Sequence, residues 1–309
     1  MIETPRPTVV PGHVLVQPEV LSLCGSDIHM LHFSAAEDYP FPPGTTGHEM
    51  AGTVVETGPD VAGFAPGDRV LALSPEHQAM SEFFLARVEH VVPLPDGLPL
   101  ELLVQAQQLG TVLYASQRLP NVIGKNIAVI GQGSAGLWFD FLLRRLGARR
   151  VIALDLERFR IDLAPRFGAT HTIVVGEQDP ADVLPEICGG QLPDIVVEAA
   201  GEPAAINAAV ELVRPHGEIL FFGLPRGLDF VFNYERYFRK CCRSSAIVGA
   251  ATEPDQLSTQ IAIDWVARGI ADPKPLVTHR APFAEVLDAY KMHRDRADGA
   301  VKIVIEMPR

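Results

Sequence analysis

A short run of glycines sets the strongest constraint on how this chain folds. Residues 131–136 read G-Q-G-S-A-G; they follow the apolar segment 126–130 and open a segment with helical periodicity. In such a turn Gly131 allows the sharp change of direction, Gly133 lets the backbone approach a pyrophosphate, and Gly136 lets the helix pack closely on a sheet. The helix N-terminus then offers free N–H groups and a partial positive charge to phosphates. The motif therefore predicts a strand–turn–helix unit that binds a dinucleotide.

An acidic residue stands where a dinucleotide site needs one. Asp155 follows the next apolar strand, 151–154, and lies 19 residues beyond Gly136. A carboxylate there accepts hydrogen bonds from the adenosine ribose and repels the additional phosphate of NADP. Arg158 and Arg160 follow, and either is able to pair with that phosphate or to lie over the adenine ring. We predict NAD rather than NADP, because the acid stands at the strand end itself. An ordinary glycine turn followed by an unrelated aspartate is the alternative interpretation.

The segments around the glycine turn alternate between apolar strands and helices. The predicted strands are 126–130, 151–154, 172–175, 194–198 and 218–223, and the predicted helices are 134–146, 161–167, 180–187 and 204–213. Apolar strands that alternate with helices form a parallel sheet buried on both faces, with right-handed crossovers. The central part of the chain is therefore expected to be an α/β domain with a doubly wound parallel sheet.

The two ends of the chain have a different pattern. Up to about residue 108, short strand-like segments such as 13–17 and 52–56 are separated by turns that contain Pro and Gly, as in small β-rich units. The tail is predicted to contain two helices and a final strand, at 256–268, 283–294 and 300–305. The pattern alone leaves open which domain this tail completes.

Composition narrows the classes of partner. The 309 residues include 38 acidic and 26 basic ones, for a net charge of −12, and no long run of Lys or Arg stands out. This argues against a nucleic acid or an anionic membrane as partner. Four cysteines do not make a disulfide framework, and the adjacent Cys241 and Cys242 are poorly placed to bond to each other. The N-terminus lacks the apolar core of a signal peptide, so we expect a cytoplasmic protein of about two domains.

Three polar features stand out in the first 110 residues. They are the segment from Cys24 to His29, the pair His48-Glu49, and Gln107-Gln108 within an apolar run. A thiolate and an imidazole suit zinc better than calcium or magnesium, and a catalytic zinc takes three protein ligands and one open position. The spacing alone is also compatible with no metal site, in which case Cys24 is a small buried apolar residue and His48 an ordinary polar one.

Taken together, these motifs resemble the zinc-dependent medium-chain alcohol dehydrogenase family, and within it the threonine and sorbitol dehydrogenase-like members. The matching stretches are 23–29 (L-C-G-S-D-I-H), 47–49 (G-H-E), 67–70 (G-D-R-V), the glycine turn with Asp155, and 299–304 (G-A-V-K-I-V). They span nearly the whole chain in the family's order. The resemblance implies a GroES-like β-rich catalytic domain built from 1–108 and 248–309, with a Rossmann NAD-binding domain at 109–247.

The resemblance also assigns roles to single residues. Cys24 and His48 match zinc ligands, and Asp27 matches a carboxylate that orients the histidine ligand. Ser26 matches the hydroxyl that hydrogen-bonds the substrate oxygen, and His29 matches the outer end of a proton relay.

Further roles concern the metal and the cofactor. Glu49 matches a carboxylate beside the metal that serves as an alternative ligand, and Arg160 matches a basic residue near the adenosine ribose. The implied reaction moves a hydride between NAD and a small alcohol or its carbonyl, with zinc lowering the pKa of the bound alcohol. A homodimer or homotetramer is implied as well.

The third zinc ligand departs from the family's pattern. The family places Cys, Asp or Glu at the position that matches Gln107, and a neutral amide binds zinc more weakly than an anion. Three interpretations stay open: Gln107 ligates directly, Glu49 completes the set, or zinc is held loosely or not at all. The family's cysteine-rich lobe for a second, structural zinc is not matched between Val70 and Val92, so one catalytic zinc at most is expected.

Two other classes of function compete with a zinc dehydrogenase. Zinc-free quinone or enone reductases share the architecture, but they lack a Cys–His pair and usually prefer NADPH. A non-catalytic nucleotide-binding relic is the other alternative, against which the intact Ser26 and His29 argue. Six further histidines are expected to be surface or structural residues: His13, His77, His90, His216, His279 and His293.

Overall fold

The structure, a computed structural model, describes residues 2–227 and 229–308 and divides into two compact units. One unit combines the chain up to Thr111 with the chain from Ala250 onwards, and the other runs from Val112 to Gly249. Both ends of the chain therefore contribute to the same unit. Within the described residues, no helix is long and apolar enough to cross a bilayer.

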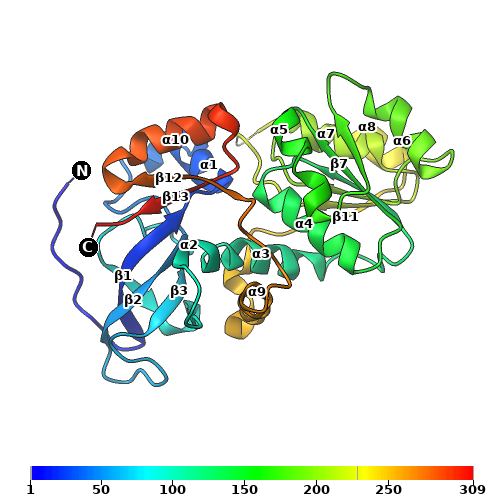
Figure 1. The fold of residues 1–309 in the computed structure, drawn as a ribbon. Helices are drawn as coiled ribbons and strands as arrows, with labels where there is room; N and C mark the ends of the chain where they lie inside the picture. The colour runs from blue at the N-terminus through cyan, green and yellow to red at the C-terminus, as the bar shows by residue number, and fades with distance from the viewer. Residues whose placement is uncertain (1, 228, 309) are drawn as a thin grey trace. The chain divides into compact units, whose positions relative to one another are not determined.

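The first unit is built on a seven-stranded sheet in the order β12-β13-β1-β2-β3-β5, with β4 paired to β1. Its strands are β1 (His13–Ser22), β2 (Glu49–Thr57), β3 (Arg69–Leu73), β4 (Phe84–Arg87), β5 (Val91–Pro93), β12 (Val277–Pro282) and β13 (Lys302–Glu306). The C-terminal strand β13 pairs antiparallel with the N-terminal strand β1, and Figure 1 shows the blue and red strands side by side. This pairing brings residues near position 300 next to residues 20–24.

Helices complete the first unit. They are α1 (Gly25–Phe33), α2 (Leu100–Leu103), α3 (Ala106–Ser116), whose second half lies in the other unit, α9 (Leu257–Ala267) and α10 (Val286–Asp295). One apolar cluster joins the inner face of β1, β2 and β13 to α1 and α10; its members include Leu21, Ile28, Met50, Ala289 and Ile305. Because the helix α1 starts directly after β1, its first residues are fixed by this core.

The second unit is an all-parallel sheet in the order β11-β10-β9-β6-β7-β8. Its strands are β6 (Asn126–Ile130), β7 (Arg150–Asp155), β8 (His171–Val174), β9 (Ile195–Glu198), β10 (Glu218–Phe221) and β11 (Arg243–Ala246). Counted within the unit, this is the order 3-2-1-4-5-6 of the Rossmann fold. The helices are α4 (Ser134–Arg145), α5 (Arg158–Ile161), α6 (Pro180–Cys188), α7 (Pro203–Leu212) and α8 (Tyr234–Arg239). The predicted doubly wound α/β fold is confirmed.

Some predicted elements differ from the observed ones. The helix predicted over 161–167 is split into α5 and a 3₁₀ turn at Ala164–Phe167, because Pro165 has no amide proton and Gly168 turns into the left-handed region at φ 105°. The helix predicted over 283–294 begins with a 3₁₀ turn, and α10 starts at Val286. The edge strand β11 was not predicted, because its residues Arg-Ser-Ser-Ala are polar and mostly exposed and have no apolar periodicity.

Candidate active site

Three potential metal ligands meet where β1 leads into α1. Cys24 precedes the first residue of α1, while His48 and Glu49 stand at the start of β2. One ligand atom from each of the three lies within 4.8 Å of the other two. Leu23, next to Cys24, is anchored by an N–H bond of 2.9 Å to the carbonyl of Ile303 on β13. Because a helix N-terminus favours negative charge, the position of Cys24 suits a thiolate ligand.

Asp27 is the buried residue that organises this cluster. Its Oδ2 accepts a hydrogen bond of 3.0 Å from the amide of Cys24, and its Oδ1 accepts one of 3.3 Å from the amide of Gly47. The same Oδ1 lies 3.4 Å from Nδ1 of His48. Burial alone would raise the pKa of Asp27, but hydrogen bonds from His48 and His77 hold it well below its ordinary value. A charged Asp27 fixes the Nδ1–H tautomer of His48 and leaves Nε2 free to bind a metal.

His77 is part of the site, contrary to the expectation of a surface or structural residue. It lies in the loop after β3, with Nδ1 3.5 Å from Oδ1 of Asp27 and its ring centroid 4.2 Å from that of His48. Asp27 therefore faces two imidazoles. The sequence gives no signal for this contact, because the loop between β3 and β4 has no periodic pattern that would place a single histidine.

Glu49 is paired with a lysine from the far end of the chain. Nζ of Lys302 lies 2.7 and 2.5 Å from the two carboxylate oxygens of Glu49 and also donates to the carbonyl of Leu23 at 3.0 Å. Both side chains are fully buried. The ammonium group thus neutralises Glu49 and ties strand β13 to the peptide that joins Leu23 to Cys24.

Gln108, on α3, contacts the thiol of Cys24. Nε2 of Gln108 lies 3.9 Å from Sγ of Cys24, while Oε1 of the same side chain is buried without a hydrogen-bond partner. Ligation by Gln107, which is also buried on this helix, stays a prediction. Amide oxygen and nitrogen are interchangeable by a half-turn of the side chain, so Gln108 is able to present an oxygen here.

The residues present fit zinc. A thiol, an imidazole and a carboxylate converge, and an unpartnered amide oxygen belongs to the glutamine that touches the thiol. This donor set matches the sulfur, nitrogen and oxygen ligands that zinc takes. Ser26 and His29 stand three residues apart on α1, and therefore on one face of the helix, directly after Cys24.

The glycine turn has the geometry that the sequence predicts. Gly131 has φ 92°, and a Cβ there would lie 2.9 Å from Ala200. At Gly136 a Cβ would lie 1.8 Å from the carbonyl oxygen of Gly131, so no other residue fits without moving the turn. The space over Gly133 is open: the nearest atom to a Cβ there is Nη1 of Arg160, at 4.0 Å. An open backbone beside a guanidinium group is suited to a phosphate.

Asp155 lies at the end of β7, directly beside this turn. Its Oδ2 accepts a hydrogen bond of 2.6 Å from the amide of Gln132, and its Oδ1 accepts one of 2.9 Å from the amide of Glu157. Nη1 of Arg160 lies 3.9 Å from Oδ2. Two backbone donors therefore hold the carboxylate in one orientation at the edge of the turn.

Comparisons with known proteins agree with what each of the two units shows. Residues 10–96 match the alcohol dehydrogenase GroES-like domain, and residues 136–268 match the zinc-binding dehydrogenase domain. The chain belongs to the zinc-dependent medium-chain dehydrogenase family. The GroES-like domain and the Rossmann domain that the sequence predicts are both confirmed, and so is an oxidoreductase that acts on CH–OH groups.

Individual relatives are distant but span the chain. It is 27% identical to the sorbitol dehydrogenase of Bacillus subtilis, covering 98% of this chain and 93% of that one. It is 29% identical to the L-threonine 3-dehydrogenase of Stenotrophomonas maltophilia, covering 73% and 74% respectively. A solved zinc-binding dehydrogenase of Sinorhizobium meliloti bound to NADP shares the fold, with a TM-score of 0.82 at 23% identity, covering 97% and 93%.

Glu198 is a buried acidic residue of this dehydrogenase. The sequence predicts it only as the last residue of a strand. It ends β9, the strand beside β6, and its Oε1 accepts 2.8 Å hydrogen bonds from the amides of Ala200 and Gly201. Those residues form the turn that packs against Gly131. Burial, with a smaller contribution from Glu202, raises the pKa of Glu198 to about 7, although the backbone donors oppose the shift.

Glu198 is expected to make the stability of this dehydrogenase depend on pH. Its pKa is about 7 when folded and 4.5 in the reference state, so its contribution to stability is full below pH 4.5 and is lost as the pH rises to 7. The loss should reach about 3 kcal/mol. Urea unfolding of the metal-free and cofactor-free chain across this pH range should show that the free energy of unfolding depends less on pH in Glu198→Gln than in wild type. The exposed Glu186→Gln variant should keep the wild-type slope; an equal slope in Glu198→Gln would contradict the assignment.

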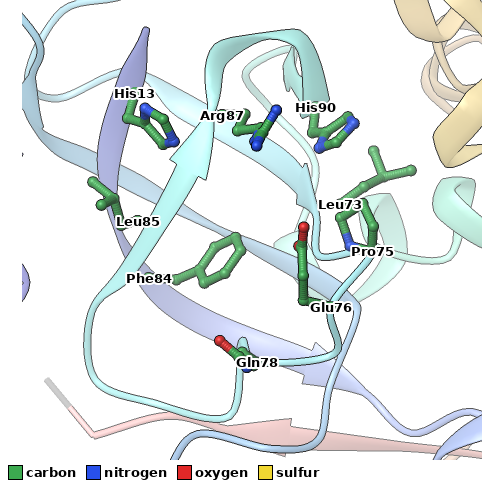
Figure 2. Close-up of a pocket in the computed structure, with 9 residues that line it drawn as sticks. All are labelled: His13, Leu73, Pro75, Glu76, Gln78, Phe84, Leu85, Arg87 and His90. Carbon is green, nitrogen blue, oxygen red and sulfur yellow. The ribbon is translucent and has the colours of Figure 1, made fainter. Parts of the chain in front are cut away.

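A separate pocket lies on the first unit, over β1, β3 and β4, and contains none of the candidate ligands. Figure 2 shows Phe84, Leu85 and Leu73 around it, with His13, Arg87, His90 and Glu76 among its polar side chains. Arg87 is also within 3.6 Å of Glu89. Since basic and acidic groups are mixed around it, the pocket favours no one charge of ligand.

Proposed function

We propose that this chain is a zinc- and NAD-dependent dehydrogenase of polyols or similar small secondary alcohols. The observation that carries the proposal is the convergence of Cys24, His48 and Glu49, the first two of which contact Asp27, in a chain that also carries an intact dinucleotide turn. A zinc-free quinone or enone reductase is not favoured, because the Cys–His pair is present and the relatives are named as sorbitol and L-threonine dehydrogenases.

The metal is held by Cys24, His48 and Glu49 in this proposal, with Gln108 as a neutral neighbour. When bound, zinc supplies a Lewis acid beside the substrate hydroxyl, and NAD supplies the hydride acceptor. Asp27 keeps the imidazole of His48 in the ligating tautomer. The positive charge of Lys302 offsets the negative charge of Glu49. The net negative charge around the metal is therefore smaller than the sum over its ligands.

Proton removal falls to two residues of α1. Ser26 hydrogen-bonds the substrate hydroxyl and accepts its proton as the alcohol is oxidised. His29, one helical turn further on, receives that proton and exchanges it with solvent, which an imidazole does readily near neutral pH. In the reduction direction the same two residues return a proton to the carbonyl oxygen.

The substrate class follows from the named relatives. Sorbitol and L-threonine, the substrates in those names, each carry a secondary hydroxyl with a polar group on the neighbouring carbon. We propose a polyol first, because the sorbitol dehydrogenase aligns along almost the whole chain. A homodimer or homotetramer is proposed as the assembly, since among the described residues β11 leaves one edge of the parallel sheet unpaired.

NAD is proposed over NADP because Asp155 is held in place by two amides beside the turn. We expect wild type to favour NAD by at least about tenfold in kcat/KM, since an anion at this position repels the 2′-phosphate. Asp155→Asn keeps the shape of the side chain and removes its charge. It should reduce the preference for NAD over NADP in kcat/KM about tenfold. Asp162→Asn, at an exposed position just after α5, is the matched control. Equal use of both cofactors by wild type would contradict the assignment.

The test of the function is metal content together with turnover. Protein purified without a metal-affinity tag should contain about one zinc per chain, and NADH production from sorbitol or xylitol should stop on chelation and return with zinc. No zinc after incubation with excess metal, or turnover that survives chelation, would reject the proposal. Turnover on L-threonine but not on polyols would keep the mechanism and change the substrate.

His77 supports the metal centre in this proposal, and its removal should be measurable. His77→Ala should weaken zinc binding by about 10–100-fold, because it removes one of the two imidazoles that fix Asp27. Competition with a chromophoric chelator measures this directly. His90→Ala, in the pocket of Figure 2, is the control and should bind zinc as wild type does. In an Asp27→Asn background the effect of His77→Ala should largely vanish; a fully additive loss would show that His77 acts by another route.

A further inference from the structure

A buried carboxyl group lies beneath the dinucleotide turn. Asp140 is on α4, is fully buried, and has no hydrogen-bond partner for either carboxyl oxygen within the described part of the chain. The polar side chain that it faces is the carboxamide of Gln132, the residue between the first two glycines of the turn. Nothing in the proposed chemistry uses Asp140, so its presence in an apolar helix–sheet interface needs another explanation.

Gln132 connects this interior position to the nucleotide side of the turn. Its side chain is fully buried, with Nε2 donating at 3.2 Å to the carbonyl of Val129, which leaves Oε1 buried without a partner. Its backbone amide points the other way and donates at 2.6 Å to Oδ2 of Asp155. One residue therefore joins the buried side of the turn to the acid that is proposed to select NAD.

The face of α4 that carries Gly136 and Asp140 lies next to the side chain of Gln132. Gly136 and Asp140 are four residues apart and so lie on the same face of α4. A Cβ at Gly136 would lie 3.5 Å from Nε2 of Gln132, which places the carboxamide over this face. Asp140 is the next side chain along the face, one turn further from the glycines.

The protonation state decides what Asp140 can do. Burial raises the pKa of Asp140 well above its ordinary value, while the Gln132 amide opposes the shift only in part. A neutral carboxyl group has one O–H to donate, and Oε1 of Gln132 is an acceptor without a donor. One hydrogen bond between them satisfies an atom on each side, whereas a carboxylate would leave Oε1 unpaired.

We propose that Asp140 is a positioning residue for the cofactor, whose neutral carboxyl group donates to Oε1 of Gln132 and so holds the backbone of the turn in the place where it fixes Asp155. The inference rests on the proposed binding of NAD. It predicts that the hydrogen-bond donor, rather than the negative charge, is what position 140 contributes. An apolar side chain there would leave Oε1 of Gln132 buried and unpaired, and the turn would be free to shift.

Two substitutions at one position separate the donor from the charge. Asp140→Asn keeps a donor and has no charge, whereas Asp140→Leu has a larger side chain of the same branched shape and no donor. The Kd for NADH is measured by fluorescence titration of the zinc-loaded full chain. It should stay within about twofold of the wild-type value for Asp140→Asn and rise about tenfold for Asp140→Leu. The KM for the alcohol should be unchanged in both. Gln132→Met removes the acceptor and should weaken NADH binding similarly, which keeps the test available if Asp140→Leu does not fold.

The outcomes distinguish this inference from the function beneath it. NADH binding by Asp140→Leu and Gln132→Met at the wild-type level would overturn the inference, as would an equal loss in Asp140→Asn and Asp140→Leu. A wild-type chain that binds neither NADH nor NADPH would instead reject the proposed function. Retained binding in Asp140→Asn with a loss in Asp140→Leu is the expected result.

Discussion

Replacing Lys302 with Met is expected to lower the free energy of unfolding of the metal-free chain by about 3–5 kcal/mol. Lys302 and Glu49 are both fully buried and in direct contact. Methionine fills a similar volume but leaves the Glu49 carboxylate in the interior without a counter-charge, and the carbonyl of Leu23 also loses a donor. Most of the expected cost is this uncompensated charge rather than the lost attraction of the pair itself. Urea unfolding at neutral pH measures it.

Two further variants make this result specific. Lys291→Met removes a surface lysine whose ion pair with Asp288 is exposed, and it should change stability by less than about 1 kcal/mol. The double variant Lys302→Met with Glu49→Leu removes both charges and should recover much of the loss, because two apolar side chains replace the buried pair. A Lys302→Met variant as stable as wild type would show that Glu49 is not a buried anion.

The same variant also addresses the third metal ligand. If Glu49 binds zinc, the metal takes over as counter-charge when Lys302 is gone, so Lys302→Met should lose less stability in the zinc-loaded form than in the metal-free form. If Gln107 or another neutral group completes the site instead, the two forms should lose the same amount. The comparison therefore decides between the interpretations that the sequence left open.

Local patterns in the sequence were sufficient for the second unit. Its strands are apolar and its helices periodic, and the glycine turn with Asp155 is a motif whose spacing is fixed by a single strand–turn–helix–strand unit. Everything that defines this motif lies within about 25 residues, so hydrophobic periodicity and turn chemistry predict it without knowledge of tertiary contacts. The polar edge strand β11 was not predicted, because its residues have no apolar pattern.

The first unit was harder to predict because its contacts span the whole chain. Lys302 reaches Glu49 across 253 residues of sequence, and only the pairing of β13 with β1 brings them together. His77 reaches Asp27 from an irregular loop, and Gln108 reaches the thiol of Cys24 across 84 residues of sequence. Glu198 and Asp140 read as ordinary acids in the sequence, because their burial depends on how the second unit packs.

Replacement of Cys24 is expected to have the largest effect on activity. Cys24→Ser keeps the size of the side chain but replaces a soft anionic ligand with a neutral hydroxyl, so zinc content should fall from about one per chain to a small fraction. Turnover should fall by at least about 10³-fold, since metal polarisation of a substrate oxygen contributes several kcal/mol to the transition state. NADH binding should be unchanged, because the glycine turn and Asp155 belong to the other unit.

The controls for this experiment come from the chain's own cysteines. Cys188 is buried in the core of the second unit, where burial raises its pKa to about 11, and Cys241 is exposed. Cys188→Ser and Cys241→Ser should both retain zinc and turnover. If Cys24→Ser kept its zinc and its rate, the metal would have to be held elsewhere. If it lost zinc but kept its rate, hydride transfer would not need the metal, and the zinc-free class of reductase would become the better account of this fold.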